Sequence, residues 1–223
     1  MSIILENPDP VEKKRAADIA YDALESMIVT MELKPGSPII EAMLIEKTGL
    51  GRTPLREALM RMSSNGLILQ MPRRGLVVSD IEASAHLSLI ETRRVLERLI
   101  VQNAAEKASV QQRKELVVCA EQMLIAAKRH TLGEYMAADQ AFDHIVQNAC
   151  ANPSAVAAVI PLIIKSRRFW YAYQHEGDLE ECARCHLLVA KAVSKGKTEL
   201  AIKAIDGLMD YLESFARLLP AAV

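Results

Sequence analysis

Apolar residues recur at helical spacing along most of this chain, except in one stretch that carries two short strand-like runs. Residues 52–64 present a single apolar stripe at positions i, i+3, i+4 and i+7. The stripe consists of Leu55, Ala58, Leu59 and Met62. Strand-like runs at 67–69 and 76–78 then flank a turn-compatible segment, 72–75. The pattern predicts a helix followed by a β-hairpin.

Local signals agree with this order of elements. Gly49 and Gly51 end one helical segment and open a turn. Thr53 is placed to cap the next helix, and Pro54 suits its first position because that N–H is not needed there. Residues 65–66, Asn-Gly, end the helix. A turn, a capped helix, a glycine stop and a hairpin form the outline of a winged helix-turn-helix, which places one helix in the major groove of DNA.

Beyond Ser79 the helical period continues without further strand signals. The predicted helices cover residues 80–107, 110–130, 132–149, 154–173, 178–194 and 197–218. We expect a kink or a split near Pro161 and a loop at 175–178. The first of these helices is expected to bury a broad apolar face made of Leu87, Ile90, Val95, Leu96, Leu99 and Ile100.

The fold class that follows is mainly α. An N-terminal winged helix-turn-helix, residues 1–79, precedes a C-terminal antiparallel bundle of six or seven helices, residues 80–223, because consecutive helices with short links pack as an antiparallel bundle.

Composition narrows the class of protein. Hydrophobic residues make up 51% and charged residues 25% of the 223 residues, as in globular proteins. The aromatic content of 4% argues against a stacking platform for single-stranded nucleic acid. We find no export signal, and the longest apolar run, 155–164, is too short to span a bilayer. We therefore expect a cytoplasmic protein without a membrane partner, whose four cysteines are reduced.

Positive charge is concentrated in residues 48–79. Five arginines, at positions 52, 56, 61, 73 and 74, stand against one acid, Glu57, so this segment carries +4 in a chain of net charge −1. Arg52 and Arg56 are four residues apart and off the apolar stripe, so they can point outward together. A local positive patch suits contacts with phosphates. The alternative is a solvated helix and hairpin with an accidental arginine cluster.

The segment GRTPLREAL at 51–59, with its lead-in at 31–49, resembles the DNA-binding domain of the GntR family of bacterial transcription regulators. The resemblance implies contacts to base edges and phosphates of a half-site, and a wing near the minor groove. The residues it implies for DNA binding are Arg52, Thr53, Arg56, Arg73, Arg74 and Gly75. One departure is Ala42, which follows Glu41 where some relatives carry a DNA-contacting arginine.

The remainder, roughly 83–218, resembles the helical FCD domain of the FadR-like subfamily through ETRRVLE (91–97), ADQAFD (138–143), NACANP (148–153) and CHLLVAKAV (185–193). In that subfamily the bundle binds a small carboxylate metabolite, often beside a divalent metal, and builds a homodimer. The resemblance therefore implies a non-enzymatic transcription regulator, a repressor, that binds an inverted repeat and responds to a small carboxylate effector.

Candidate ligands for a divalent metal such as Zn, Ni or Mn are Asp139 and Asp143, which share a helix face, and His186 on a later helix. The subfamily set is one Asp and three His. Here Asp143 stands where the second His is expected and Leu208 where the last is expected. The alternatives are a water-filled polar pocket without metal, or a metalloenzyme built on the same three residues.

Arg93 is the remaining effector-binding candidate, because the subfamily pattern puts an inward arginine there to hold a carboxylate. Its alternative is a surface ion pair with Glu97. The sequence CARCH at 182–186 matches a c-type haem motif, but two thiols beside a pocket histidine are the favoured interpretation. Arginines and aromatic residues cluster before the loop at 175–178, namely Arg167, Arg168, Trp170, Tyr171 and Tyr173. Such a cluster could bind an acidic ligand or line a dimer interface, but a helix end rich in cations is the commoner explanation.

Overall fold

The structure, a computed structural model, describes residues 14–82, 84–173 and 179–218. The predicted loop at 175–178 lies outside the described residues. Two compact units divide the chain: one comprises Met1–Ile28 and Glu32–Ser79, the other Val29–Met31 and Asp80–Val223. None of the helices in the described part of the chain combines the length and the apolar character needed to cross a membrane.

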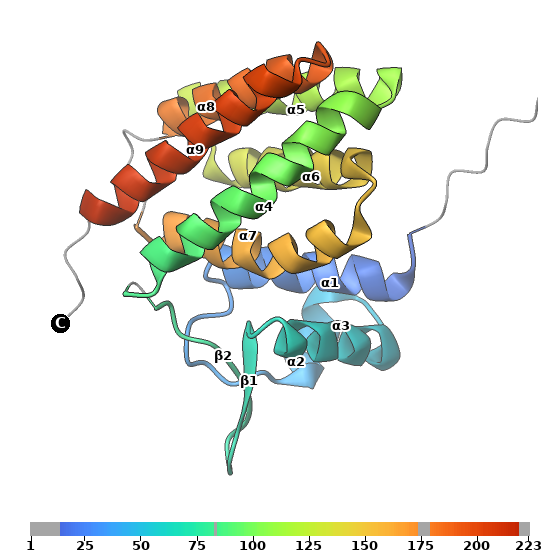
Figure 1. Ribbon diagram of the computed structural model, residues 1–223. Helices are drawn as coiled ribbons and strands as arrows, with labels where there is room; N and C mark the ends of the chain where they lie inside the picture. Colours follow the sequence, from blue (N-terminus) through green and yellow to red (C-terminus); the bar gives the residue numbers. More distant parts are fainter. Residues whose placement is uncertain (1–13, 83, 174–178, 219–223) are drawn as a thin grey trace, which may run out of the picture. The chain divides into compact units, whose positions relative to one another are not determined.

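The first unit contains three helices and a hairpin (Figure 1). They are α1 Ala16–Val29, α2 Glu41–Thr48, α3 Arg52–Ser64, β1 Ile68–Met71 and β2 Gly75–Val78. The strands are antiparallel, with Ile68 opposite Val78 and Met71 opposite Gly75. The predicted stripe of α3 is buried in full, which confirms the helix and its orientation. The two predicted strands of the hairpin are also confirmed.

The turn between α2 and α3 is built by two glycines. Gly49 ends α2 in the left-handed conformation (φ 69°) and donates its N–H to the carbonyl of Ile45. Gly51 is the N-cap of α3, so the prediction of Thr53 as the cap was wrong. Pro54 then occupies the third helical position rather than the first. A proline is tolerated there because the first helical N–H groups have no intrahelical acceptor.

The hairpin tip requires two left-handed residues. Arg73 (φ 63°) and Gly75 (φ 72°) both adopt this conformation, and the N–H of Arg74 donates to the carbonyl of Met71 at 3.2 Å. Glycine adopts such a conformation without cost, whereas an arginine is strained by about 1 kcal/mol. The wing therefore presents Arg73 in a conformation that its own backbone does not favour.

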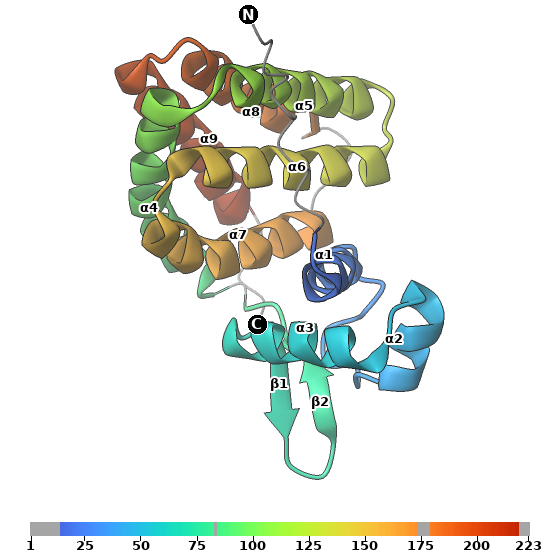
Figure 2. The ribbon, with the colours of Figure 1, turned by 90° about the vertical axis from the view of Figure 1, so that its right-hand side faces the viewer.

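The second unit is the predicted antiparallel bundle, with six helices in the described residues. They are α4 His86–Lys107, α5 Val110–Lys128, α6 Leu132–Cys150, α7 Pro153–Tyr173, α8 Leu179–Ser194 and α9 Thr198–Leu218. Figure 2 shows α5 and α6 side by side, and α5 also packs on α8. Helix α4 packs against α6, α7 and α9 and so contributes to the interior from one side.

Two features of these helices differ from the expectation. Helix α7 is not split at Pro161 but continues through it, because the buried side chains that follow it offset the lost hydrogen bond. Helix α4 exposes 67% of Val95 and 40% of Leu99, whereas Arg93 and Glu97 are buried on its inner face. The apolar pattern misplaced this face because two charged residues that pair with each other can occupy interior positions.

Candidate functional site

The arginines of the first unit fall into two groups. Arg52, Arg73 and Arg74 are exposed and, among the described residues, form no ion pair. Arg56 is exposed as well, but its Nε donates to both carboxylate oxygens of Glu41 at 3.0 Å. The charge of +4 predicted for residues 48–79 includes Arg56. Glu41, which lies outside this segment, neutralises that arginine.

Arg61 is exposed, but its side chain is engaged by residues of its own unit. Its Nη1 donates to Asp18 at 2.8 Å, and its guanidinium stacks 4.3 Å from the centre of the Tyr21 ring. Both partners belong to α1. Arg61 thus ties α3 to α1, which leaves Arg52 at the start of α3 and the two wing arginines as the unpaired cations of the predicted DNA-binding set.

The departure at Ala42 has a structural counterpart. Glu41, the first residue of α2, precedes Ala42 and accepts two hydrogen bonds from Arg56. Glu41 therefore fixes the side chain of an arginine on α3. Thr53 lies exposed in the first turn of α3, next to Arg52. Gly75 closes the wing beside Arg74 with a left-handed backbone.

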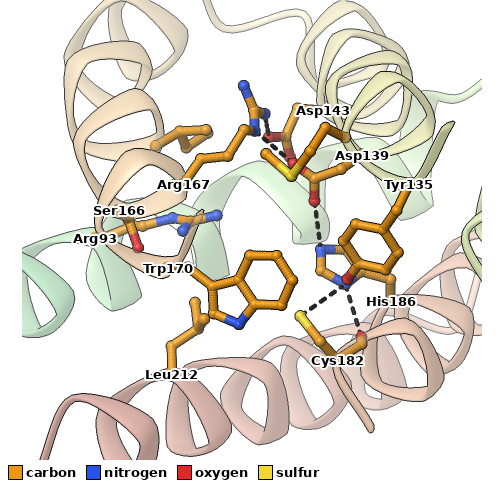
Figure 3. Close-up of a pocket in the computed structure, with 12 residues that line it drawn as sticks. Arg93, Tyr135, Asp139, Asp143, Ser166, Arg167, Trp170, Cys182, His186 and Leu212 are labelled. Carbon is orange, nitrogen blue, oxygen red and sulfur yellow. Dashed lines mark hydrogen bonds and ion pairs between the residues drawn. The ribbon is translucent and has the colours of Figure 1, made fainter. Parts of the chain in front are cut away.

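A cavity of about 30 Å³ lies inside the second unit (Figure 3). This volume holds only a few water molecules. Five helices line it, with Arg93 from α4, Tyr135, Met136, Asp139 and Asp143 from α6, Ile163, Ser166, Arg167 and Trp170 from α7, Cys182 and His186 from α8, and Leu212 from α9. The α7 residues recur at i, i+3, i+4 and i+7, so one face of that helix forms a wall of the cavity.

All four predicted effector residues line this cavity. The Nε of Arg167 donates to Asp139 and its Nη2 donates to Asp143. The Nε2 of His186 lies 3.3 Å from the second oxygen of Asp139, and its Nδ1 donates to the carbonyl of Cys182 at 2.8 Å. The predicted convergence of the two carboxylates and the imidazole is present, with a guanidinium joined to both carboxylates.

Arg93 both pairs with Glu97 and lines the cavity. It does pair with Glu97, through its Nε at 2.9 Å, but the pair is buried instead of lying on the surface. The guanidinium also lines the cavity. A guanidinium carries five N–H donors, and this hydrogen bond uses one of them. Arg93 therefore retains donors for a ligand.

Burial and neighbouring charges set the protonation of the carboxyl groups. Burial raises the pKa of Asp139, but Arg167 and the other nearby cations outweigh it and hold this pKa below its usual value. At Asp143 burial prevails over Arg167, and the pKa is raised. Burial also raises the pKa of Glu97, which Arg93 offsets only in part. Asp139 is therefore the acid that stays ionised most readily beside Arg167.

Three polar atoms of the cavity wall lack a hydrogen-bond partner in the described part of the molecule: the hydroxyl of Tyr135 on α6 and two groups on α7. The two groups on α7 are the hydroxyl of Ser166 and the indole N–H of Trp170, on side chains that are almost fully buried. A buried polar atom without a partner costs about 1–3 kcal/mol. The indole N–H can only donate, and the hydroxyl can donate or accept. A ligand with acceptor atoms would satisfy both groups.

The donor set does not fit a divalent metal. In the part of the chain that the structure describes, no group of three His, Cys, Asp or Glu side chains is arranged to hold one. Arg167 binds both carboxylates that such an ion would need. Leu208 is buried, and the wall receives Leu212 from the same helix. Cys182 lies in the wall, but Cys185 does not. The metalloenzyme alternative thus finds no support.

Sequence reasoning did not assign three of the wall residues to the site. For Arg167 and Trp170 an acidic ligand was only the less favoured alternative to a cation-rich helix end, and Ser166 was not considered. The signal that would have found them is their spacing on α7, where an apolar residue, a serine, an arginine and a tryptophan fall on one face.

Comparison with known proteins decides the family. The FCD domain family matches residues 88–211, more than half of the chain, and the family described as bacterial regulatory proteins, gntR family, matches residues 16–78. The chain belongs to the GntR family of transcription regulators. These matches confirm the resemblance stated from the sequence for both of its parts.

Relatives within the GntR family cover most of the chain. An HTH-type transcriptional regulator from the TAR-I ttuE-ttuC' intergenic region of Agrobacterium vitis is 30% identical over 64% of this chain and 85% of its own length. The HTH-type transcriptional repressor RspR of Escherichia coli is 26% identical over 88% of this chain and 87% of its own. The solved structure of E. coli McbR/YncC shares the fold, with a TM-score of 0.77, 19% identity and coverage of 92% and 99% of the two chains.

Proposed function

We propose that this GntR-family regulator is a repressor that binds an inverted repeat as a homodimer and leaves its DNA when a small carboxylate enters the cavity of the second unit. Family membership supports DNA binding, and one relative carries the name of a repressor. The α3 residues Arg52, Thr53 and Arg56 would read each half-site. Arg73, Arg74 and Gly75 would place the wing against the DNA backbone.

The observation that carries the effector proposal is the set of unused donors in the cavity wall. Arg93 offers the N–H groups that Glu97 does not engage, and Trp170 and Ser166 offer a buried N–H and a hydroxyl without partners. A carboxylate has two oxygens that accept several hydrogen bonds, and it pairs well with a guanidinium. Donors from α4 and α7 would thus converge on one anion.

The cavity volume limits the ligand. A space of about 30 Å³ admits an acid of a few heavy atoms, and a larger one must displace wall side chains. Displacement of this kind supplies the differential interaction that regulation requires, because a ligand shifts an equilibrium only if it binds the two states unequally.

Trp170 makes the test direct. It is the chain's single tryptophan and lines the cavity, so its emission reports ligand entry without a label. Small mono- and dicarboxylates are titrated into the full-length protein, and their effect on a labelled upstream duplex is followed by fluorescence anisotropy. Size-exclusion chromatography with light scattering gives the oligomeric state.

We expect one acid to change Trp170 emission and to release the duplex over the same concentration range. Ser166→Ala should weaken its binding several-fold, whereas the control Ser194→Ala, at a half-buried site at the end of α8 and outside the cavity wall, should not. The effector proposal fails if acids release DNA while Ser166→Ala and Arg93→Gln leave the affinity for the acid unchanged.

A further inference from the structure

Two buried acids on α6 lie close enough together to favour a compensating cation. Asp139 and Asp143 are four residues apart, so both side chains emerge on one helix face, and each is only 13% exposed. Ionised carboxylates removed from water at such a distance repel each other and lose hydration. A cation between them therefore stabilises this part of the bundle, because it offsets the repulsion and the burial that would otherwise favour protonation of one of the acids.

Arg167 supplies that cation from the opposite wall. Its side chain is 7% exposed and reaches both carboxylates with different nitrogens, Nε and Nη2 (Figure 3). A guanidinium is planar and keeps its charge, so one side chain can bridge two acids. The second oxygen of Asp139 faces His186, so both of its oxygens already have a partner.

A divalent ion would have to displace this arrangement. The ion would compete with Arg167 for the same oxygens, and the displaced guanidinium would remain buried beside it in a cavity of about 30 Å³. Like charges at that separation are unfavourable in a buried site. The acids that might hold an ion are thus committed to a residue of the chain itself.

We infer that the guanidinium of Arg167 is the resident cation of this site and that the helical unit works without a divalent metal. The inference concerns the same cavity as the proposed function. It relies on that function for one point only, that a ligand enters the cavity. A ligand carboxylate would accordingly be held by guanidinium and neutral donors and not by coordination. Chelators would leave its binding unchanged.

The test uses metal alone, so that its outcome does not depend on the effector. The full-length protein is purified, its metal content is measured by inductively coupled plasma mass spectrometry, and its melting temperature is recorded with EDTA, ZnCl2, NiCl2 or MnCl2. We expect no stoichiometric metal and no metal-dependent shift. Stoichiometric metal, or stabilisation that Asp139→Asn abolishes, would overturn the inference.

Arg167→Met provides the converse experiment. It removes the charge and leaves both acids and His186 in place, so the melting temperature should fall by about 6 °C or more in EDTA. Zinc or nickel should restore part of this loss, and Asp139→Asn in the same variant should remove the rescue. Arg98→Met is the matched control, because Arg98 pairs with a single acid, Asp206, on the surface.

An Arg167→Met protein that fails to fold even with metal still leaves the measurements on the wild type to decide. Arg167→Lys, which keeps the charge but cannot bridge both acids in the same way, should show an intermediate melting temperature and no gain from metal. If wild-type protein proves metal-free and no carboxylate binds, only the effector proposal is lost.

Discussion

The division of the arginines in the first unit makes a quantitative prediction for DNA binding. The logarithm of the association constant falls with the logarithm of salt concentration by about 0.9 for each phosphate that a cation neutralises. In a dimer, the unpaired arginines Arg52, Arg73 and Arg74 would give a slope of about −5 if each met one phosphate. All five arginines of residues 48–79 would give about −9.

Substitution of two arginines on the same helix separates these cases. Arg52→Ala should lower the slope by about 1.8 in a dimer and weaken binding by about 1–3 kcal/mol per protomer. Arg61→Ala should leave both the slope and the affinity close to the wild type, because Asp18 and Tyr21 already engage this guanidinium. Arg61→Ala should instead lower the free energy of unfolding by about 1 kcal/mol, because it removes the surface ion pair and the stacking on the ring.

The assay is fluorescence anisotropy of a labelled operator duplex at salt concentrations from about 50 to 200 mM. Urea unfolding of each variant measures the stability effect. A random duplex of equal length separates base reading from phosphate contact, since a lost phosphate contact weakens binding to both duplexes equally. Equal losses of affinity in Arg52→Ala and Arg61→Ala would refute the assignment. An unchanged salt slope in Arg52→Ala, with the loss confined to the operator duplex, would place Arg52 on a base edge and not on a phosphate.

Three further predictions concern single side chains. His86 is buried and stacks on Phe169, and this burial lowers its pKa to about 4. Because the pKa is lower in the folded protein, protonation of His86 favours the unfolded chain. The free energy of unfolding, followed by Trp170 emission, should be constant above pH 6.5 and fall by up to about 3 kcal/mol between pH 6.5 and 4, and His86→Phe should lack this part of the fall. Ser109→Ala removes the capping box that Ser109 forms with Gln112 at the start of α5. The free energy of unfolding, measured with urea, should fall by about 1 kcal/mol. An equal loss in a variant of an exposed mid-helix serine would argue against capping. Arg73→Asn should keep or raise stability, because asparagine tolerates the left-handed conformation, while it weakens duplex binding; unchanged binding would remove Arg73 from the interface.

Most of the helices were predictable because they bury an apolar face whose period the sequence displays, although the face of α4 was misplaced. The stripe of α3 illustrates this, since its four members are all buried. The cap of α3 was not predictable in the same way. Thr53 was expected as the cap, but the helix begins directly after Gly51, and this start depends on how the chain leaves Gly49 in its left-handed conformation.

The cavity was harder to predict because its chemistry depends on which of two adjacent arginines faces the cavity. On α4, Arg93 points to Glu97 and the cavity, while Arg94 pairs with acids of α9 such as Asp210. On α7, Arg167 enters the wall of the cavity and its neighbour does not. Adjacent residues differ by about 100° around a helix, and the packing of other helices fixes that rotation.

The position of Arg93 bears on how a ligand in the cavity could change DNA affinity. A tenfold change requires that the ligand bind two states of the protein with free energies that differ by about 1.4 kcal/mol. One hydrogen bond to a charged group contributes about 1.5–3 kcal/mol. Arg93 belongs to α4, which begins at His86, and β2 of the wing ends at Val78. A ligand that draws Arg93 from Glu97 acts on α4, the helix that follows the wing in the chain. The free energy of one altered hydrogen bond there is sufficient for a tenfold change in DNA affinity.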